Sequence, residues 1–140
     1  MKGNLIIRGF ARGQQRPKFS TFGGHVRAYD RQESVDFKNM VKLFFAQKYP
    51  NFIPTDKPVK FGINVYKEVP KAVSNKKRKE LIENETPDLR KPDIGNIFKA
   101  VEDALTGYLY KDDRQIWGYL DCKKVYAENE YFEIFWEIGE

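Results

Sequence analysis

The stretch KPDIGNIFKAVEDALTGYLYKDDRQI, residues 91–116, predicts the centre of the fold. At about 100° per residue, a helix through its first half has one apolar side and one polar side. The apolar side would carry Ile94, Ile97, Phe98, Val101, Ala104 and Leu105. The polar side would carry Gly95, Asn96, Lys99, Glu102 and Asp103. We therefore expect an amphipathic helix whose apolar side packs on a core and whose polar side faces solvent or a substrate.

Length and composition favour one soluble domain, residues 1–140, with a core of its own. The chain has 25 Lys and Arg against 20 Asp and Glu, a formal net charge of +5, which weakly favours a polyanionic partner. The single cysteine, Cys122, excludes an intrachain disulfide and a cysteine-rich zinc site. No apolar run approaches the roughly 18 residues of a membrane span. We expect a cytoplasmic protein without a membrane partner.

Hydrophobic periodicity predicts further elements on both sides of the central helix. Helices are expected over residues 34–49, with Phe37, Val41, Phe44 and Phe45 on one face, and from a Ser74 cap to Ile82. Strands are expected over 5–11, over 59–69 as a half-buried strand, over 116–126 and over 131–138. The turn at 128–130 predicts a closing β-hairpin. The fold class is therefore α/β (α+β), a single domain with a mixed sheet and about three helices.

Two segments concentrate positive charge. Residues 12–29 combine glycine, proline and basic residues with aromatic ones, which indicates a loop or loose hairpin. Such a segment either contacts DNA phosphates and bases or is a solvated loop whose aromatic residues enter the core. The helix after Ser74 either follows a DNA backbone or is simply a solvated basic helix. The candidate DNA contacts are Arg12, Arg16, Lys18, Arg27, Lys76, Lys77, Arg78 and Lys79.

Acidic residues stand at both ends of the central stretch. Asp93 precedes the helix, and Asp112 and Asp113 precede the next strand. Locally, Asp93 is most simply a helix cap, and the acidic pair is most simply a turn. Cleavage of a phosphodiester, however, requires an activated water and stabilised phosphoryl charge, which hard divalent cations held by carboxylates supply. If the helix packs on that strand, the two acidic ends can converge.

The run KPD-x-x-N-x-x-K, followed by DAL-x-G-x-L-x-x-DD-x-Q-I, resembles the RusA family of Holliday junction resolvases. Ile7-Arg8-Gly9 and Val69-Pro70-Lys71 resemble other segments of the same family. The resemblance implies a crossover junction endodeoxyribonuclease of the phage and prophage type, dependent on Mg²⁺ or Mn²⁺. It implies that four-way junctions and related branched DNA are cut in recombination and repair, by a homodimer.

The resemblance also implies roles for individual residues. Asp93 and Asp113 match the family's catalytic metal ligands, with Asp112 beside them as a further candidate ligand. Lys99 matches the active-site lysine, which could meet a phosphate oxygen or orient the water. Asn96 could support a ligand by hydrogen bonding.

The chain departs from the family pattern at one position. The family motif is D-x-D-N, and Gly95 stands where its second aspartate would be. Loss of one acid out of three would lower metal affinity and could slow cleavage by two or more orders of magnitude, about 3 kcal/mol. Three explanations remain open: a catalytically inactive junction-binding or regulatory protein of a mobile element, a change introduced in cloning, or compensation by another acid. The candidate compensating acids are Asp112, Asp103 and Asp88.

Overall fold

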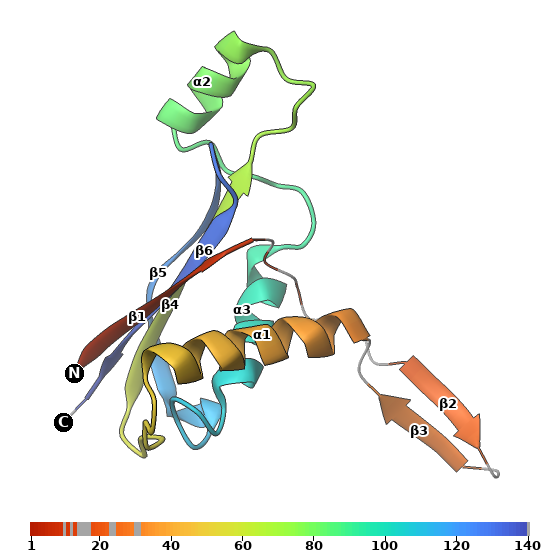
Figure 1. Ribbon diagram of the computed structural model, residues 1–140, viewed down its shortest axis with the longest axis vertical. Coiled ribbons are helices and arrows are strands. Elements are labelled where there is room, and N and C mark those ends of the chain that lie inside the picture. Colours follow the sequence, from red (N-terminus) through yellow and green to blue (C-terminus); the bar gives the residue numbers. More distant parts are fainter. Residues whose placement is uncertain (10, 12, 14–17, 23–24, 30–31, 140) are drawn as a thin grey trace.

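The structure is a computed structural model that describes residues 1–9, 11, 13, 18–22, 25–29 and 32–139. Within these residues, six strands and three helices make up the fold (Figure 1). The strands are β1 (Lys2–Arg8), β2 (Lys18–Phe22), β3 (His25–Tyr29), β4 (Val59–Glu68), β5 (Ile116–Ala127) and β6 (Tyr131–Ile138). The helices are α1 (Gln32–Lys48), α2 (Asn75–Glu83) and α3 (Ile94–Leu105). A short 3₁₀ turn, Asp113–Gln115, precedes β5.

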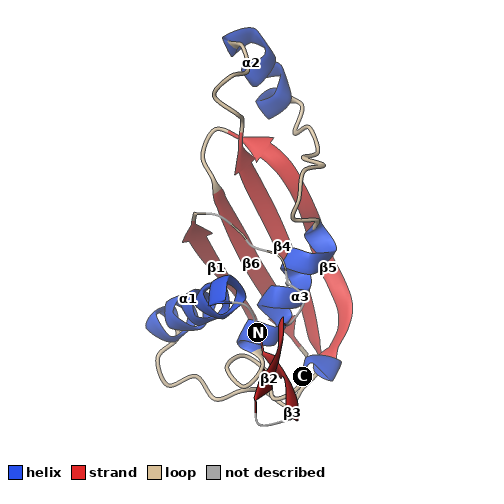
Figure 2. Cartoon of the chain, turned by 90° about the vertical axis from the view of Figure 1, so that its right-hand side faces the viewer, coloured by secondary structure: helices blue, strands red, loops and turns tan. Residues whose placement is uncertain are grey.

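Four strands form one mixed sheet in the order β1-β6-β4-β5. The β4–β5 pair is parallel, and the other two pairs are antiparallel. Helices α1 and α3 cover one face of this sheet (Figure 2). The core lies between them and the sheet, and its largest fully buried side chains include Trp136, Tyr110, Phe45, Phe61 and Phe132. The predicted α+β class, a single domain with a mixed sheet and three helices, is confirmed.

Strand β4 is more deeply buried than the half-buried strand predicted for residues 59–69. Val59, Phe61 and Ile63 face the helices, but Gly62 and Asn64 on the opposite face are also buried. The reason is the central position of β4 and the ring of Phe135, which lies across Gly62: a Cβ at Gly62 would be 2.6 Å from Phe135 Cε2. Alternation along one strand cannot report what a neighbouring strand covers.

The last two strands are antiparallel and joined by a short turn, as expected of a closing hairpin. They differ from the expectation in their pairing, because β4 lies between them and both form their ladders with β4. Neighbouring strands are about 4.8 Å apart, so the turn at 128–130 must span about 10 Å, which three extended residues can do. The position between the two closing strands is occupied by β4, which is the most deeply buried of the three strands.

Helix α1 buries Phe37, Val41 and Phe45 as predicted, but not Phe44. The Phe44 side chain is 37% exposed, because it lies about 100° around the helix from Phe45. Helix α2 begins after Ser74, whose hydroxyl accepts a hydrogen bond from Lys77 N at 3.2 Å, so the predicted cap is confirmed.

Two parts of the chain project from the main sheet (Figure 1). The two-stranded β2–β3 sheet confirms a hairpin within residues 12–29. Helix α2 stands beyond the opposite end of the sheet and buries none of its residues. Of the helices in the described part of the chain, none is long and apolar enough to span a membrane.

Candidate functional site

Helix α3 is fixed on the sheet by its apolar side. Ile97, Val101, Ala104 and Leu105 are fully buried, and the Phe98 ring stands perpendicular to that of Phe61 with centroids 5.4 Å apart. Because one side is buried this completely, the orientation of the opposite side is also determined. Residues 95, 99 and 102 are spaced by four and three positions and therefore form a single stripe, here called the polar stripe.

Asp93 occupies the N-cap position of α3 with extended backbone angles, φ −72° and ψ 156°. Its side chain nevertheless accepts no cap hydrogen bond, and the residue is exposed. The local sequence thus predicted the position of Asp93 correctly but not the use of its carboxylate. An exposed carboxylate without this capping contact keeps its oxygens available to another ligand.

Gly95 stands on the exposed side of α3, in open space. A Cβ built there has a single neighbour within 4 Å, the Asp93 Oδ2 atom at 3.7 Å. A side chain at position 95 would therefore begin beside the Asp93 carboxylate. An aspartate at this position would give two neighbouring carboxyl groups at the start of α3 without any steric conflict.

Asp112 and Asp113 have different environments although they are adjacent. The Asp112 carboxylate caps the 3₁₀ turn, accepting from Arg114 N at 2.8 Å, and pairs with Arg114 Nε at 3.2 Å. The hydrogen bond from the Arg114 backbone is the main reason why the pKa of Asp112 is lowered. Asp113 is exposed. Asp112 is thus occupied by the turn, and Asp113 is the acid that the turn presents.

Glu102, which sequence reasoning did not single out as a site residue, lies within the electrostatic field of Asp113. Burial is the main cause that raises the Glu102 pKa from 4.5 to about 7, and the charges of Asp113 and Asp103 raise it further, while Lys99 opposes them. The charges of Lys99 and Asp113 therefore both act on Glu102, in the second half of the polar stripe. The available sequence signal was a glutamate three residues after Lys99 and seven after Gly95, on the same side of the helix. The meeting of Asp93 and Asp113 at one cation stays a prediction.

The three acids considered as replacements for the missing aspartate all have other partners. Asp103 pairs with Lys38 of α1 at 3.6 Å. Asp88 is 2% exposed and pairs with Arg90 at 2.8 Å, and Asp112 serves its turn. Within the described residues, no group of three or more His, Cys, Asp or Glu side chains could hold a metal ion.

The segment after β1 reaches the start of α3 at Gly13. A Cβ there would lie 2.9 Å from Pro92 Cβ and 3.0 Å from Asn96 Cβ, so this approach requires glycine. Asn96, the predicted supporting residue, is exposed beside this contact. The chain at Gly13, within the basic segment of residues 12–29, therefore borders the start of the polar stripe.

The candidate DNA contacts have different positions. Lys18 lies in β2 and Arg27 in β3, whereas Arg12 and Arg16 fall outside the described residues. On α2, Arg78 turns back and donates to Pro70 O at 3.2 Å. The three lysines of the run, Lys76, Lys77 and Lys79, are exposed. Two of them form exposed ion pairs on α2, Lys77 with Glu80 at 4.0 Å and Lys79 with Glu83 at 3.8 Å. Exposed pairs of this kind contribute little, so a phosphate could replace the acidic partner.

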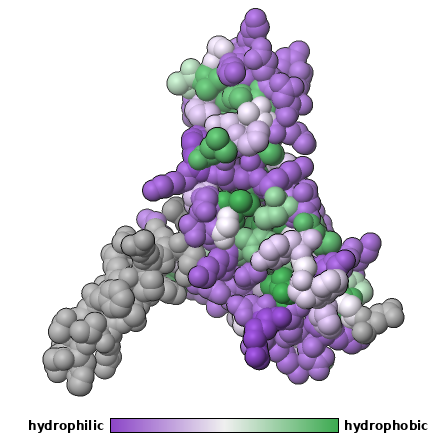
Figure 3. All heavy atoms as spheres, turned by 180° about the vertical axis from the view of Figure 1, so that it is seen from behind, coloured by the Kyte–Doolittle hydropathy of each residue, from purple (hydrophilic) through white to green (hydrophobic). Residues whose placement is uncertain are grey.

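Two aromatic residues at the start of β5 are largely exposed, Trp117 at 65% and Tyr119 at 68%. Lys60 Nζ lies 4.8 Å from the centroid of the Trp117 ring, and Tyr119 packs edge-on against Phe98 of α3 at 4.7 Å. Their alternation directly after the acidic turn was a sequence signal that was not used. Seen from behind, the described residues present a mostly hydrophilic surface with separate hydrophobic patches (Figure 3).

Comparison with known proteins assigns the family. The family model described as "Endodeoxyribonuclease RusA" matches residues 9–135, a range that contains both halves of the central motif. A protein of Bacillus subtilis (strain 168), "Uncharacterized protein YqaN", is 40% identical over 123 residues, which is 86% of this chain and 85% of that protein. Because the family model matches most of the chain and this relative is similar over nearly its whole length, the chain belongs to the RusA family of endodeoxyribonucleases.

Proposed function

We propose that this protein is a divalent-metal-dependent endonuclease for branched DNA, chiefly four-way junctions, whose cleavage rate is limited by Gly95. The RusA family implies an endonuclease that resolves Holliday junctions. The observation that carries the proposal for this chain is the carboxylate of Asp93, which stands exposed at the start of a rigidly packed helix and serves no cap. Because this carboxylate does not cap α3, it is a candidate metal ligand.

The residues present fit a cation that binds together with DNA. Magnesium in proteins keeps several waters and is usually held by one or two carboxylates plus substrate phosphates, rather than by a cage made only of protein. Asp93 and Asp113 are exposed acids of this kind. Such a cation would supply an activated water and would stabilise charge on the phosphate.

The polar stripe supports a role for Lys99 next to these acids. Lys99 is exposed, and its charge reaches Glu102 in the second half of the stripe. An ammonium there would meet a phosphate oxygen and stabilise its negative charge. Asn96, one residue beyond Gly95, would orient the DNA or a ligand by hydrogen bonding.

The basic elements would hold the substrate. The β2–β3 hairpin and α2 project from opposite parts of the molecule (Figure 1), so each can follow a different stretch of backbone. A four-way junction is resolved by two paired cuts, which suits a homodimer that presents two identical sites related by two-fold symmetry. Binding should weaken strongly with salt, since phosphate contacts release counterions.

The experiment compares the protein as it stands with Gly95→Asp on labelled four-way junctions and on a linear duplex, with Mg²⁺ and with Mn²⁺. We expect Gly95→Asp to cut the junction at least about 100-fold faster, about 3 kcal/mol in barrier height, because the new carboxylate would stand beside Asp93. Gly95→Asn is the matched control, since it adds the same volume without charge. Equal cleavage by the Asp and Asn variants would contradict the proposal.

A second candidate function is junction binding without cleavage. It is favoured by Gly95 and by the lack of a three-acid group among the described residues. It predicts salt-sensitive binding to four-way junctions, and no metal-dependent product even with Gly95→Asp. Quenching of the exposed Trp117 offers a direct binding signal, because the other tryptophan, Trp136, is buried.

A further inference from the structure

The segment that leads into Asp93 first follows the free edge of β5. Tyr126 N donates to Thr86 O, and Asp88 N donates to Lys124 O, each at 3.0 Å. After Asp88 the chain leaves this edge and turns toward the start of α3. The position of the Asp93 carboxylate therefore depends on what holds residues 89–93.

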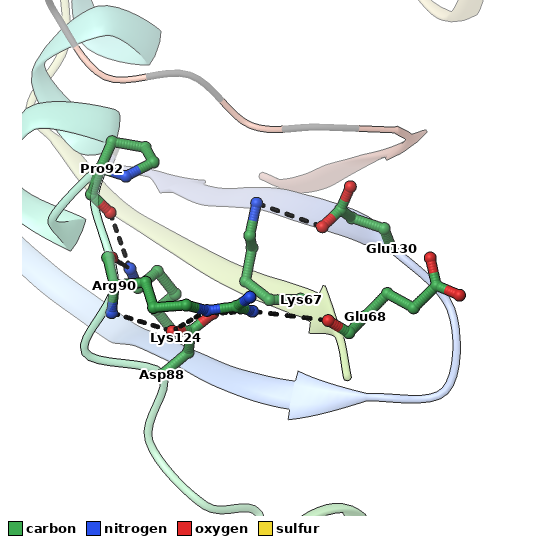
Figure 4. A network of polar contacts seen from close by, with 7 residues as sticks. All are labelled: Lys67, Glu68, Asp88, Arg90, Pro92, Lys124 and Glu130. Carbon is green, nitrogen blue, oxygen red and sulfur yellow. Dashed lines mark hydrogen bonds and ion pairs between the residues drawn. The ribbon is translucent and has the colours of Figure 1, made fainter. Parts of the chain in front are cut away.

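Lys124 of β5 holds this turn from beneath. The residue is 8% exposed, and its ammonium donates to Pro92 O at 2.7 Å and also to Arg90 O (Figure 4). The Pro92 carbonyl belongs to the planar peptide that joins Pro92 to Asp93. By fixing the direction of this carbonyl, Lys124 fixes the plane from which the Asp93 side chain projects.

An ion pair between half-exposed Arg90 and the buried Asp88 carboxylate holds the same turn at its other end. Arg90 donates to the Asp88 carboxylate from its backbone N at 2.9 Å, from Nε at 3.0 Å and from a terminal nitrogen at 2.8 Å. Burial alone would raise the Asp88 pKa, but the hydrogen bonds from Arg90 and the charges of Arg90 and Lys124 lower it. Asp88 thus stays charged and balances the two cations around the turn (Figure 4).

Burying the Lys124 ammonium has a cost in free energy. An ammonium removed from water is destabilising unless its N–H groups are bound, and an apolar side chain of similar length would fill the same space without that penalty. What lysine adds is several donors at the end of a long chain, which can bind two carbonyls at once. This arrangement indicates that Lys124 serves to fix the directions of the two carbonyls rather than to stabilise the fold.

We propose that Lys124 is a positioning residue for Asp93, setting the direction of that carboxylate through the carbonyls of Arg90 and Pro92. The proposal rests on the proposed function, in which Asp93 holds a cation at the scissile phosphate. Lys124 itself lies beneath the turn, so it acts through the backbone and not on the DNA.

The experiment compares Lys124→Met with Lys123→Met, both in the protein as it stands and with Gly95→Asp. Lys123 is the neighbouring residue of β5 and borders the same hollow as Asp93, but its ammonium pairs with Glu85 at 3.7 Å and with Asp121 at 3.9 Å. The readouts are metal concentration at half-maximal cleavage, junction affinity, and amide exchange at Ile97, whose N–H binds the Asp93 carbonyl at 3.2 Å. Lys124→Gln, which keeps N–H donors without charge, is the conservative variant.

For Lys124→Met we expect at least a tenfold rise in the metal requirement, junction affinity within about twofold of the parent, and faster exchange at Ile97. Lys124→Gln should recover part of each change, and Lys123→Met should show none. If Lys124→Met does not fold, Lys124→Gln is compared with the parent instead: a higher metal requirement and faster exchange at Ile97 support the proposal, and parental values of both overturn it. Unchanged exchange and metal requirement in the folded variant would overturn the proposal.

The failure of the nuclease proposal has a different signature, which is no cleavage by any variant, including Gly95→Asp. In that case the exchange at Ile97 alone tests the positioning role. Faster exchange in Lys124→Met than in Lys123→Met would support it, and equal exchange would overturn it.

Discussion

Helices α2 and α3 are both preceded by a residue able to cap them, yet only one of the two caps is formed. Ser74 caps α2 through its hydroxyl, whereas Asp93 stands at the same place before α3 and makes no such bond. The difference follows from burial, since α2 buries none of its residues and α3 is fixed by an apolar side that is fully buried. A helix held by packing can leave its N-terminal carboxylate for a ligand, and a helix without packing cannot.

Core truncation should separate the two helices most strongly. Ile97→Ala removes a fully buried side chain of α3 and should lower the free energy of unfolding by about 3–4 kcal/mol, through lost burial and the cavity left behind. Ile82→Ala truncates a half-buried side chain of α2 and should lower the free energy of unfolding by no more than about 1 kcal/mol. Urea unfolding of both variants measures the difference. Equal losses would show that α2 is packed as firmly as α3.

Under the proposed nuclease role, α3 should be needed for cleavage and α2 for DNA binding. With Gly95→Asp present, Asp93→Ala should slow junction cleavage at least about 100-fold while leaving affinity within about twofold. Replacing Lys76, Lys77 and Lys79 together by alanine should instead weaken binding and reduce the salt slope by up to about 3. Affinities from 50 to 200 mM salt provide the measurement. A salt slope unchanged by the triple variant would remove α2 from the DNA contact surface.

The polar stripe of α3 should make stability depend on pH. Because the Glu102 pKa rises from 4.5 to about 7 on folding, the folded state binds more protons in this range, and stability falls as the pH rises through it. Glu102→Gln should flatten this part of the profile. Above pH 7 it should be more stable than the parent by about 1–2 kcal/mol, allowing for solvent screening at a half-buried site.

Thermal unfolding in EDTA from pH 4 to 9 tests this expectation without bound metal. Glu83→Gln is the control, because that carboxylate lies on α2 with 63% of its side chain exposed. A pH profile shared by the parent and Glu102→Gln would show that Glu102 is not confined by burial as the structure has it.

The smallest difference concerns the caps themselves. Ser74→Ala removes the hydrogen bond to Lys77 N and should destabilise α2 by about 1 kcal/mol, seen as faster amide exchange across residues 77–82. Asp93→Ala removes no cap hydrogen bond and should change the stability of α3 by less than about 0.5 kcal/mol. A loss at α3 as large as that at α2 would mean that Asp93 does cap its helix in solution, leaving its carboxylate occupied.

Much of this molecule could be predicted from local patterns. The buried side of α3 follows from its 3.6-residue period, the cap of α2 from Ser74, and the place of Asp113 from the turn before β5. Patterns of this kind depend on neighbours along the chain, which the sequence lists directly. The exposure of Phe44 was missed because an aromatic residue adjacent to the apolar stripe can face either way. The insertion of β4 between β5 and β6 was missed because strand order depends on contacts between distant segments.

The sequence by itself determined the family, through residue types at fixed spacing in the central motif, and the elements, through hydrophobic period and caps. The tertiary structure alone decided that the Asp93 side chain makes no cap hydrogen bond, and that the charge of Asp113 acts on Glu102. It also decided that Lys124, 31 positions after Asp93, lies beneath the turn that carries Asp93. The physical reason is that a carboxylate or an ammonium acquires its role from the groups around it. Those groups are brought together by packing across the sheet, over separations that no local pattern records.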